Sequence, residues 1–284
     1  MKREQPESLV GWVPAIWPTL ILCIFFVIPF AIMAAISFFH RVEGGFYEPG
    51  FELANYARFF TFFFSKILGF SLLVSGLAAV ICVTLGFPFT YMLTRLRRRR
   101  QIVWLVFLLS VLSLSEVIIG FSWSMLLSRT AGLSNLFVAL GLMDSPVSWS
   151  PGFAALMMGL CYLAFPYTVL ILYPPLSRLD PQLPEAARML GASPLRTFFT
   201  VVLPAQRGAV VATLIMVFVF TLGAYLLPQL LGRPQHWTLS VMITDQAILQ
   251  SNLPFAAAMA MFLMLVTLAL VGMTYVIGGE RNKP

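Results

Sequence analysis

The sequence predicts an all-α integral membrane protein with six transmembrane helices and both termini in the cytoplasm. Of its 284 residues, 60% are hydrophobic and 10% are charged, and the mean hydropathy is +0.90. A soluble domain is about a quarter charged. The apolar residues also form long uncharged runs, and roughly 20 such residues suffice to cross a hydrocarbon layer of ~30 Å. Barrel strands are improbable, because they give short alternating segments instead of solid runs.

Six uncharged runs define the predicted spans, and Glu116 is the only acidic or basic residue inside them. The spans lie at about 13–39, 67–94, 102–128, 151–173, 208–231 and 254–278. The first follows Lys2 and Arg3, as a secretory signal would, but its uncharged run exceeds a signal core of about 7–15 residues and no small-x-small cleavage site ends it. We therefore expect residues 1–284 to form a single transmembrane domain that keeps this first span.

The basic residues orient the chain. With the N-terminus inside, thirteen of the 18 lysines and arginines fall on the cytoplasmic side, among them the Arg97–Arg100 run. The outer segments hold the other five, which are Arg41, Arg58, Lys66, Arg129 and Arg233. This bias follows the positive-inside rule and places the segment 174–207 in the cytoplasm.

The basic run and the three cysteines do not indicate a nucleic-acid or metal site. A basic run directly at the end of a span is typical of contact with anionic lipid headgroups, so the sequence indicates a lipid bilayer and no nucleic acid as the partner of Arg97–Arg100. Cys23, Cys82 and Cys161 fall in three different predicted spans without neighbouring histidines. We interpret them as packing residues and predict no metal site.

The segment 174–207 is the one semi-polar block between long apolar runs, and its residues predict a helix, a turn and a second helix. Asp180-Pro181 is a capping residue followed by a proline at the first helical position, so we expect a helix over about 181–190. Gly191 supplies a residue that can adopt the left-handed conformation at the end of this helix. Ser193-Pro194 repeats the start signal for the second helix.

The same segment resembles the EAA loop of type I ABC importer permeases. In that family the pattern is Glu-Ala-Ala, three residues, Gly, nine residues, Ile, one residue and Leu-Pro. Here Glu185-Ala186-Ala187, Gly191 and Leu203-Pro204 keep the spacing, and Val201 replaces Ile. Weaker matches, at Asn55-Tyr56, Trp123 and His236-Trp237-Thr238, resemble the polyamine (spermidine/putrescine) branch of the family.

The resemblance implies a coupling role for the loop and a set of partners. In the family this element is the coupling helix, which docks into a cleft of the ATPase subunit. The docking residues implied here are Glu185, Ala186, Ala187, Arg188, Leu190, Gly191, Ala192, Ser193 and Pro194. The implied partners are two copies of an ABC ATPase subunit, a second permease chain that is homologous but different, and a periplasmic or extracellular substrate-binding protein. The implied location is the bacterial cytoplasmic (inner) membrane.

The chain itself carries no signature of catalysis, and we predict no catalytic residue and no bound cofactor. A phosphate-binding P-loop needs Gly-Lys-Ser/Thr, and none of the three lysines, Lys2, Lys66 and Lys283, follows a glycine. Gly120-Phe121-Ser122-Trp123-Ser124 lacks the second glycine of a nucleophile elbow. We therefore expect ATP and magnesium to bind the partner ATPase.

Candidate residues for the substrate pathway are few. Glu116 lies about fifteen residues into the third predicted span, roughly 22 Å deep. A carboxyl group there lines a pathway, or it is a packing or interfacial residue. The aromatic and acidic residues Trp123, Tyr162, Tyr225 and Asp245 complete the set.

The cargo remains open at this point. A carboxylate in the pathway and the polyamine-type likeness favour a small cationic or amine-bearing solute such as a polyamine. The alternatives are a permease for another small solute, such as an amino-acid derivative, an opine or ferric ion, and a secondary transporter driven by an ion gradient. The last would predict inverted repeats and several charges within the spans, and neither feature is visible.

Overall fold

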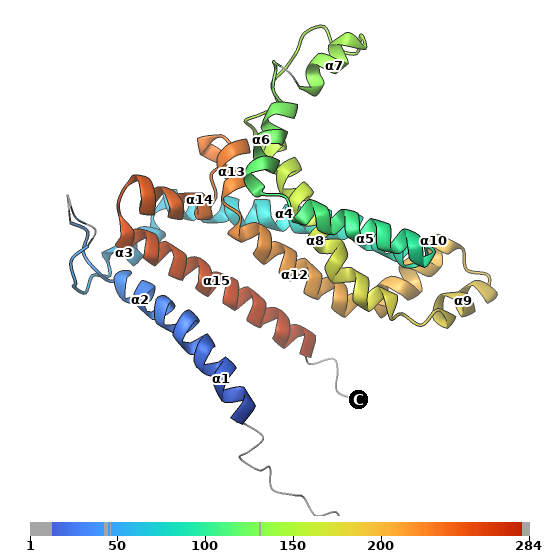
Figure 1. Ribbon diagram of the computed structural model, residues 1–284, viewed down its shortest axis with the longest axis horizontal. Helices are drawn as coiled ribbons and strands as arrows, with labels where there is room; N and C mark the ends of the chain where they lie inside the picture. Colours follow the sequence, from blue (N-terminus) through green and yellow to red (C-terminus); the bar gives the residue numbers. More distant parts are fainter. Residues whose placement is uncertain (1–12, 43–44, 46, 131, 280–284) are drawn as a thin grey trace, which may run out of the picture. The chain divides into compact units, whose positions relative to one another are not determined.

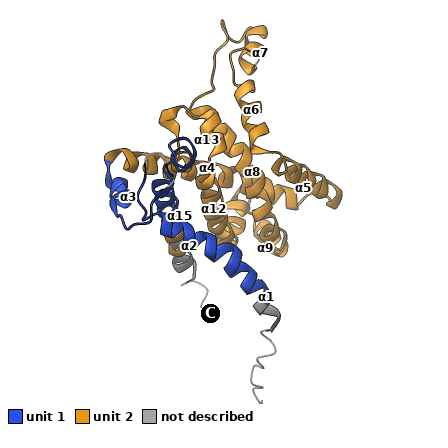
Figure 2. Cartoon of the chain, turned by 60° about the vertical axis from the view of Figure 1, so that its left-hand side comes forward, with its two compact units in different colours: residues 1–61, 243–264 blue, residues 62–242, 265–284 orange. Residues whose placement is uncertain are grey.

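The computed structural model describes residues 13–42, 45, 47–130 and 132–279, and it divides into two compact units (Figure 2). Unit 1 comprises residues 1–61 and 243–264, and unit 2 comprises residues 62–242 and 265–284. Apart from one isolated bridge between His40 and Glu48, the described residues form helices, turns and loops. The predicted all-α fold class is confirmed.

Unit 1 begins with a long apolar helix. It consists of α1 (Val13–Leu22), a π-helical turn (Cys23–Val27) and α2 (Ile28–Ile36). Residues Trp17–Ile36 are long and apolar enough to cross a membrane, and none of their side chains is buried within the chain. The unit also contains the short helix α3 (Ala54–Ala57), a 3₁₀ turn (Arg58–Phe60), a π-helical turn (Asp245–Leu249) and the first part of α15 (Leu253–Gly279).

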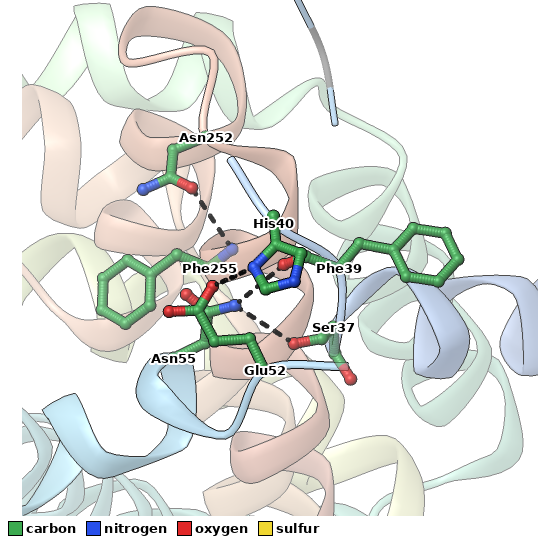
Figure 3. A network of polar contacts seen from close by, with 7 residues as sticks. All are labelled: Ser37, Phe39, His40, Glu52, Asn55, Asn252 and Phe255. Carbon is green, nitrogen blue, oxygen red and sulfur yellow. Dashed lines mark hydrogen bonds and ion pairs between the residues drawn. The ribbon is translucent and has the colours of Figure 1, made fainter. Parts of the chain in front are cut away.

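Polar contacts fix the loop after α2 (Figure 3). The side-chain amide of the buried Asn55 donates to the carbonyl oxygens of Ser37 and Phe39, at 3.4 and 3.3 Å. His40 Nδ1 lies 2.8 Å from Glu52 Oε2. The Asn55-Tyr56 pair of the sequence resemblance therefore stabilises this loop, and the Tyr56 hydroxyl also lies 2.7 Å from that of Ser37.

The centre of unit 2 is built by three long helices, α4 (Phe62–Thr94), α8 (Phe153–Ser177) and α12 (Arg207–Gly223). Small residues let them approach closely: Ser75 and Ala79 on α4 are each 1% exposed. The Thr221 hydroxyl of α12 donates to the Ser75 carbonyl oxygen at 3.4 Å. Around these contacts lie fully buried apolar side chains, including Val74, Leu156, Leu160 and Leu227.

The third predicted span is not one straight helix. It consists of α5 (Arg98–Leu112) and α6 (Glu116–Leu126), whose axes differ by 91° (Figure 1). α5 ends at Leu112 with Ser113 as its C-cap, and the Ser113 hydroxyl donates to the Leu109 carbonyl oxygen at 2.9 Å. Ser115 is extended. Serine side chains that bond nearby carbonyl groups compete with helix continuation. Uncharged composition alone could not reveal this break.

The fifth predicted span, 208–231, is also interrupted. α12 ends at Gly223, because Ala224 is extended, and a short helix α13 (Leu226–Leu231) follows. The remaining α-helices of the described residues are α7 (Leu133–Ala139), α9 (Gln182–Met189), α10 (Pro194–Thr197), α11 (Leu203–Ala205) and α14 (Leu239–Thr244). In the described part of the chain four helices are long and apolar enough to span a membrane, or up to six if each bent pair counts as one span. The predicted multi-pass architecture agrees with this range.

Candidate functional site: a capped helical loop with an exposed apolar tip

The predicted docking loop folds as a helix, a turn and a helix within unit 2, beyond the end of α8 (Figure 1). α9 starts one residue later than expected, with Pro181 at the N-cap. The Asp180 carboxylate still accepts a hydrogen bond from the Gln182 N–H at 2.9 Å. This bond satisfies one of the free donors of the first turn.

α9 ends in a complete Schellman motif. Gly191 has a φ of +85°, in the left-handed region that glycine adopts without strain. Its N–H donates to the Arg188 carbonyl oxygen at 2.9 Å, and the Ala192 N–H donates to the Ala187 carbonyl oxygen at 3.1 Å. The predicted role of Gly191 in the turn is confirmed.

The second helix begins as the sequence predicts. Ser193 is extended, and its hydroxyl oxygen accepts the Arg196 N–H at 3.3 Å, while Pro194 occupies the first turn. α10 continues through a π-helical turn over Phe198–Val202 into α11. The chain then bends by 74° into α12. Both helices of the loop are therefore capped by their own residues.

An aromatic contact anchors this second helix to α4. The Phe198 ring lies 5.4 Å from the Phe87 ring and 5.6 Å from the Tyr91 ring, measured between centroids. Val202, one turn further, is fully buried with Leu172 of α8 in the same cluster. The second helix of the loop therefore packs against two helices of the core, α4 and α8.

The tip of the loop exposes apolar side chains. Met189 and Leu190 are each 89% exposed, and Leu195 is 72% exposed. Glu185 and Arg188 are exposed on the same helix. A tip with apolar side chains beside charged ones has the composition of a protein interface, with an apolar centre and a polar rim.

The structure brings together only two of the predicted pathway residues. Trp123 of α6 and Tyr162 of α8 pack edge to face with centroids 5.7 Å apart, and both line a cavity of about 480 Å³. Glu116 is the first residue of α6, at the bend, and Tyr225 precedes α13. Neither residue lines this cavity. Asp245 belongs to unit 1.

The cavity also contains a contact that sequence reasoning missed. Cys82 of α4 and Cys161 of α8 are 79 positions apart, and the Cys82 thiol donates to the Cys161 carbonyl oxygen at 3.6 Å. Both cysteines line the cavity. Among the described residues no group of three histidine, cysteine or acidic side chains is arranged to hold a metal ion.

The His236-Trp237-Thr238 segment packs against the core of unit 2. The His236 ring stacks on Phe70 at 5.8 Å and meets the Phe153 ring edge to face at 6.0 Å. Burial, and secondarily the positive charge of Arg233, lower the pKa of His236 below its usual range. This part of the polyamine-type pattern has a packing role.

Comparison with known proteins confirms the resemblance read from the loop. No protein-family model matches the chain. The chain is 28% identical over 259 residues to the spermidine/putrescine transport system permease protein PotB of Escherichia coli, covering 91% of each protein. It is 27% identical over 254 residues to PotB of Haemophilus influenzae, covering 89% of each protein.

Solved structures agree on the fold. A bacterial ABC transporter involved in import of the acidic polysaccharide alginate contains a chain that superposes with a TM-score of 0.78 and 18% identity, over 95% of both chains. The chain has the fold of an ABC importer permease. The alginate transporter is also known in complex with an alginate pentasaccharide-bound periplasmic protein, with a TM-score of 0.73, 18% identity and coverage of 95% and 94% of the two chains.

These similarities decide two of the predictions. The relatives are permease subunits, so the prediction of a transport subunit instead of an enzyme is confirmed. The chain is a multi-pass protein of the bacterial inner membrane, as the basic residues and apolar runs predict.

Proposed function

We propose that the chain is the permease subunit of an ATP-driven importer and that residues 185–194 couple it to an ATPase subunit. One observation carries the proposal: the loop with the Glu185–Pro204 spacing is rigidly capped, is anchored to α4 through Phe198, and ends in an exposed apolar tip. A coupling loop needs these three properties. Its tip must be free to bind the ATPase subunit, its helices must be rigid enough to transmit the movement, and its anchor must pass the movement to the spans.

In this proposal the chain forms half of the pathway and binds no cofactor. ATP and magnesium bind two ATPase subunits, one beneath each permease. A second permease chain, homologous but different, supplies the other half, and a substrate-binding protein delivers cargo on the outer side. Closure of the ATPase dimer moves α9, and Phe198 and Val202 pass the movement to α4 and α8.

We propose a small cationic or amine-bearing cargo, with a polyamine as the first candidate. The similarity to PotB over most of the chain supports this choice. Glu116 is the acidic residue within a predicted span, and its half-buried place at the break between α5 and α6 suits a carboxylate that meets a cation. Trp123, Tyr162, Tyr225 and Asp245 are the further pathway candidates.

Docking is tested by purifying the chain with its ATPase subunit. Replacing Leu190 with serine removes one apolar contact from the tip, so we expect about 30-fold weaker association. The matched control is Leu142→Ser, because Leu142 is 70% exposed in the segment after α7 that is predicted to face outward. Equal association of the two variants would contradict the proposal.

The cargo is tested separately by uptake in membrane vesicles that contain the assembled transporter. We expect Glu116→Gln to reduce putrescine or spermidine uptake while ATPase association stays unchanged. Unaltered uptake of every polyamine would remove Glu116 from the pathway, and uptake of a different solute class would leave the coupling proposal in place with another cargo.

A further inference from the structure

We propose that a groove along α5 binds one acyl chain of an anionic glycerophospholipid, and that Arg97 and Arg100 hold its phosphate. The proposal depends on the cavity of unit 2, on the helical register of α5 and on the charge at its first turn. It assigns to a lipid the cavity that Trp123 and Tyr162 line, so if it holds, these two residues leave the set of pathway candidates. It does not depend on the coupling loop.

The groove is apolar and open to the surface of the chain. Its volume is about 480 Å³, and it lies among α4, α5, α6 and α8. No lining residue is charged, and the outer rim includes Leu85 at 58% and Phe107 at 55% exposure. A cationic solute would find no counter-charge in this lining, whereas an acyl chain needs none.

The register of α5 connects the groove to the arginines. Trp104, Phe107, Leu108 and Val111 line the groove, so they mark one face of the helix. Positions three and four apart share a face of a helix, which places Arg100 one turn before Trp104. Arg97 is the extended N-cap residue, three positions before Arg100. Arg98 and Arg99 point to other faces of the same turn.

The arginines lack compensating charge. Arg97 to Arg100 are all exposed, and the first turn of α5 contains no acidic residue. The one ion pair of the described residues joins His40 to Glu52, in unit 1. Four adjacent cations at the positive end of a helix repel one another. A phosphate anion would relieve this repulsion, whereas a protein partner would have to present carboxylates.

The end of the groove near the arginines is held in place without a ligand. The Gln101 side-chain amide donates to the carbonyl oxygens of Thr94 and Leu96, at 3.0 and 2.8 Å. Its oxygen accepts the Tyr173 hydroxyl of α8 at 3.0 Å. These contacts tie the first turn of α5 to α4 and α8, so the phosphate site and the apolar groove keep their spacing.

The dimensions match one leaflet. Arg100 and Val111 are eleven residues apart, or about 16 Å along a helix. Half of the hydrocarbon core is about 15 Å thick. A lipid with its phosphate at Arg100 therefore has its acyl chain beside Trp104 to Val111. Because the arginines are predicted to lie on the cytoplasmic side, the lipid belongs to the anionic inner leaflet.

The experiment compares two double variants of equal charge by native mass spectrometry of the full chain, delipidated in detergent and titrated with dioleoylphosphatidylglycerol or dioleoylphosphatidylcholine. Arg97→Gln with Arg100→Gln removes the groove-side pair, and we expect about 30-fold weaker phosphatidylglycerol binding. Arg98→Gln with Arg99→Gln is the matched control, with less than about threefold loss. Leu85→Trp fills the groove and should abolish the adduct although all four arginines remain.

Three results would overturn the proposal. Equal losses in the two double variants would show diffuse attraction to the basic run. Equal binding of phosphatidylcholine would show that the headgroup charge is irrelevant. In the assembled transporter, a diazirine-labelled phosphatidylglycerol should label residues 104–111, and crosslinking of Phe107→Cys to the second permease chain would show that protein, not lipid, fills the groove.

Discussion

At the scale of single residues, backbone conformation and local charge decide what a side chain contributes. Gly191 shows the first effect, because the turn that ends α9 requires a positive φ. His236 shows the second, because its ring is stacked on Phe70 beside the cation of Arg233. Both effects are open to measurement in single variants.

Gly191→Ala should weaken the loop without any steric clash. No atom lies within 4 Å of the added Cβ, but φ is +85°, so alanine costs about 1–2 kcal/mol at this position. We expect ATPase stimulation by substrate to fall in reconstituted transporter. The matched control is Gly208→Ala, which also meets nothing within 4 Å and lies inside α12. There alanine should be neutral or slightly stabilising. Equal effects in both variants would contradict the assignment of the turn.

Thermal stability should fall as the pH is lowered past the normal titration range of histidine, near 6.5. The folded protein lowers the pKa of His236, so the stabilisation is complete above the unfolded pKa and is lost as the pH falls through the folded one. His236→Phe keeps a ring against Phe70 and should flatten this dependence between pH 8 and 5. His40→Phe, at the other histidine of the chain, should retain it. Melting temperatures measured for both variants between pH 8 and 5 check this prediction. If the melting temperature of His236→Phe depends on pH as steeply as that of the unmodified chain, His236 is not the cause.

At the scale of elements, the structure separates what the sequence predicts from what it leaves open. Local signals act within a few residues, so the caps at Asp180 and Ser193 and the turn at Gly191 could be predicted. The break between α5 and α6 could not, because the run around Ser113 and Ser115 contains no proline or glycine, and Ser110 makes the same side-chain bond as Ser113 without ending the helix. The contact of Phe198 with Phe87 depends on a bend of 74° between α11 and α12, which no local pattern indicates.

Phe198→Ala should loosen the coupling loop from α4. A fully buried phenylalanine costs about 3–5 kcal/mol when truncated, and Phe198 is half-buried, so we expect about 2 kcal/mol of destabilisation. Transport should fall more steeply than ATPase binding, because the tip itself is unchanged. Phe199→Ala is the control, since Phe199 is 59% exposed. Urea unfolding and uptake assays on both variants measure the difference, and a Phe199 effect as large as that of Phe198 would refute the anchoring role.

At the scale of the whole molecule, composition and charge predict the class of protein. They do not predict which helices far apart in the sequence contact one another. The fold class, the membrane location and the transport role follow from the apolar runs and from the EAA spacing. The cavity does not, because it needs Trp104, Trp123 and Tyr162 from three different helices. Of the five pathway candidates, only Trp123 and Tyr162 share a site in unit 2, since aromatic composition does not encode which faces meet.

Cysteine labelling in intact cells tests the predicted orientation. Ser193→Cys in the loop should react with a membrane-impermeant maleimide only after the membrane is opened, and Leu142→Cys should react in intact cells. Ser193 and Leu142 are both exposed, so burial does not distort the comparison. Each variant is built in a chain with Cys23 replaced by serine, because Cys23 is exposed. Labelling of Ser193→Cys from outside would reverse the topology and remove the coupling role.

The break between α5 and α6 has a consequence for hydration. The Ser113 and Leu114 N–H groups still bond carbonyl oxygens of α5, at Leu109 and Val111. The first amides of α6, from Glu116 to Ile118, precede its first internal acceptor bond at Ile119. Each amide left dry in hydrocarbon costs several kcal/mol. Interrupted backbone at membrane depth is tolerated where it is buried in protein or lines a water-filled cavity. The amides of residues 116–118 therefore need either water or the proposed second permease chain at the interruption, beside the Glu116 carboxylate.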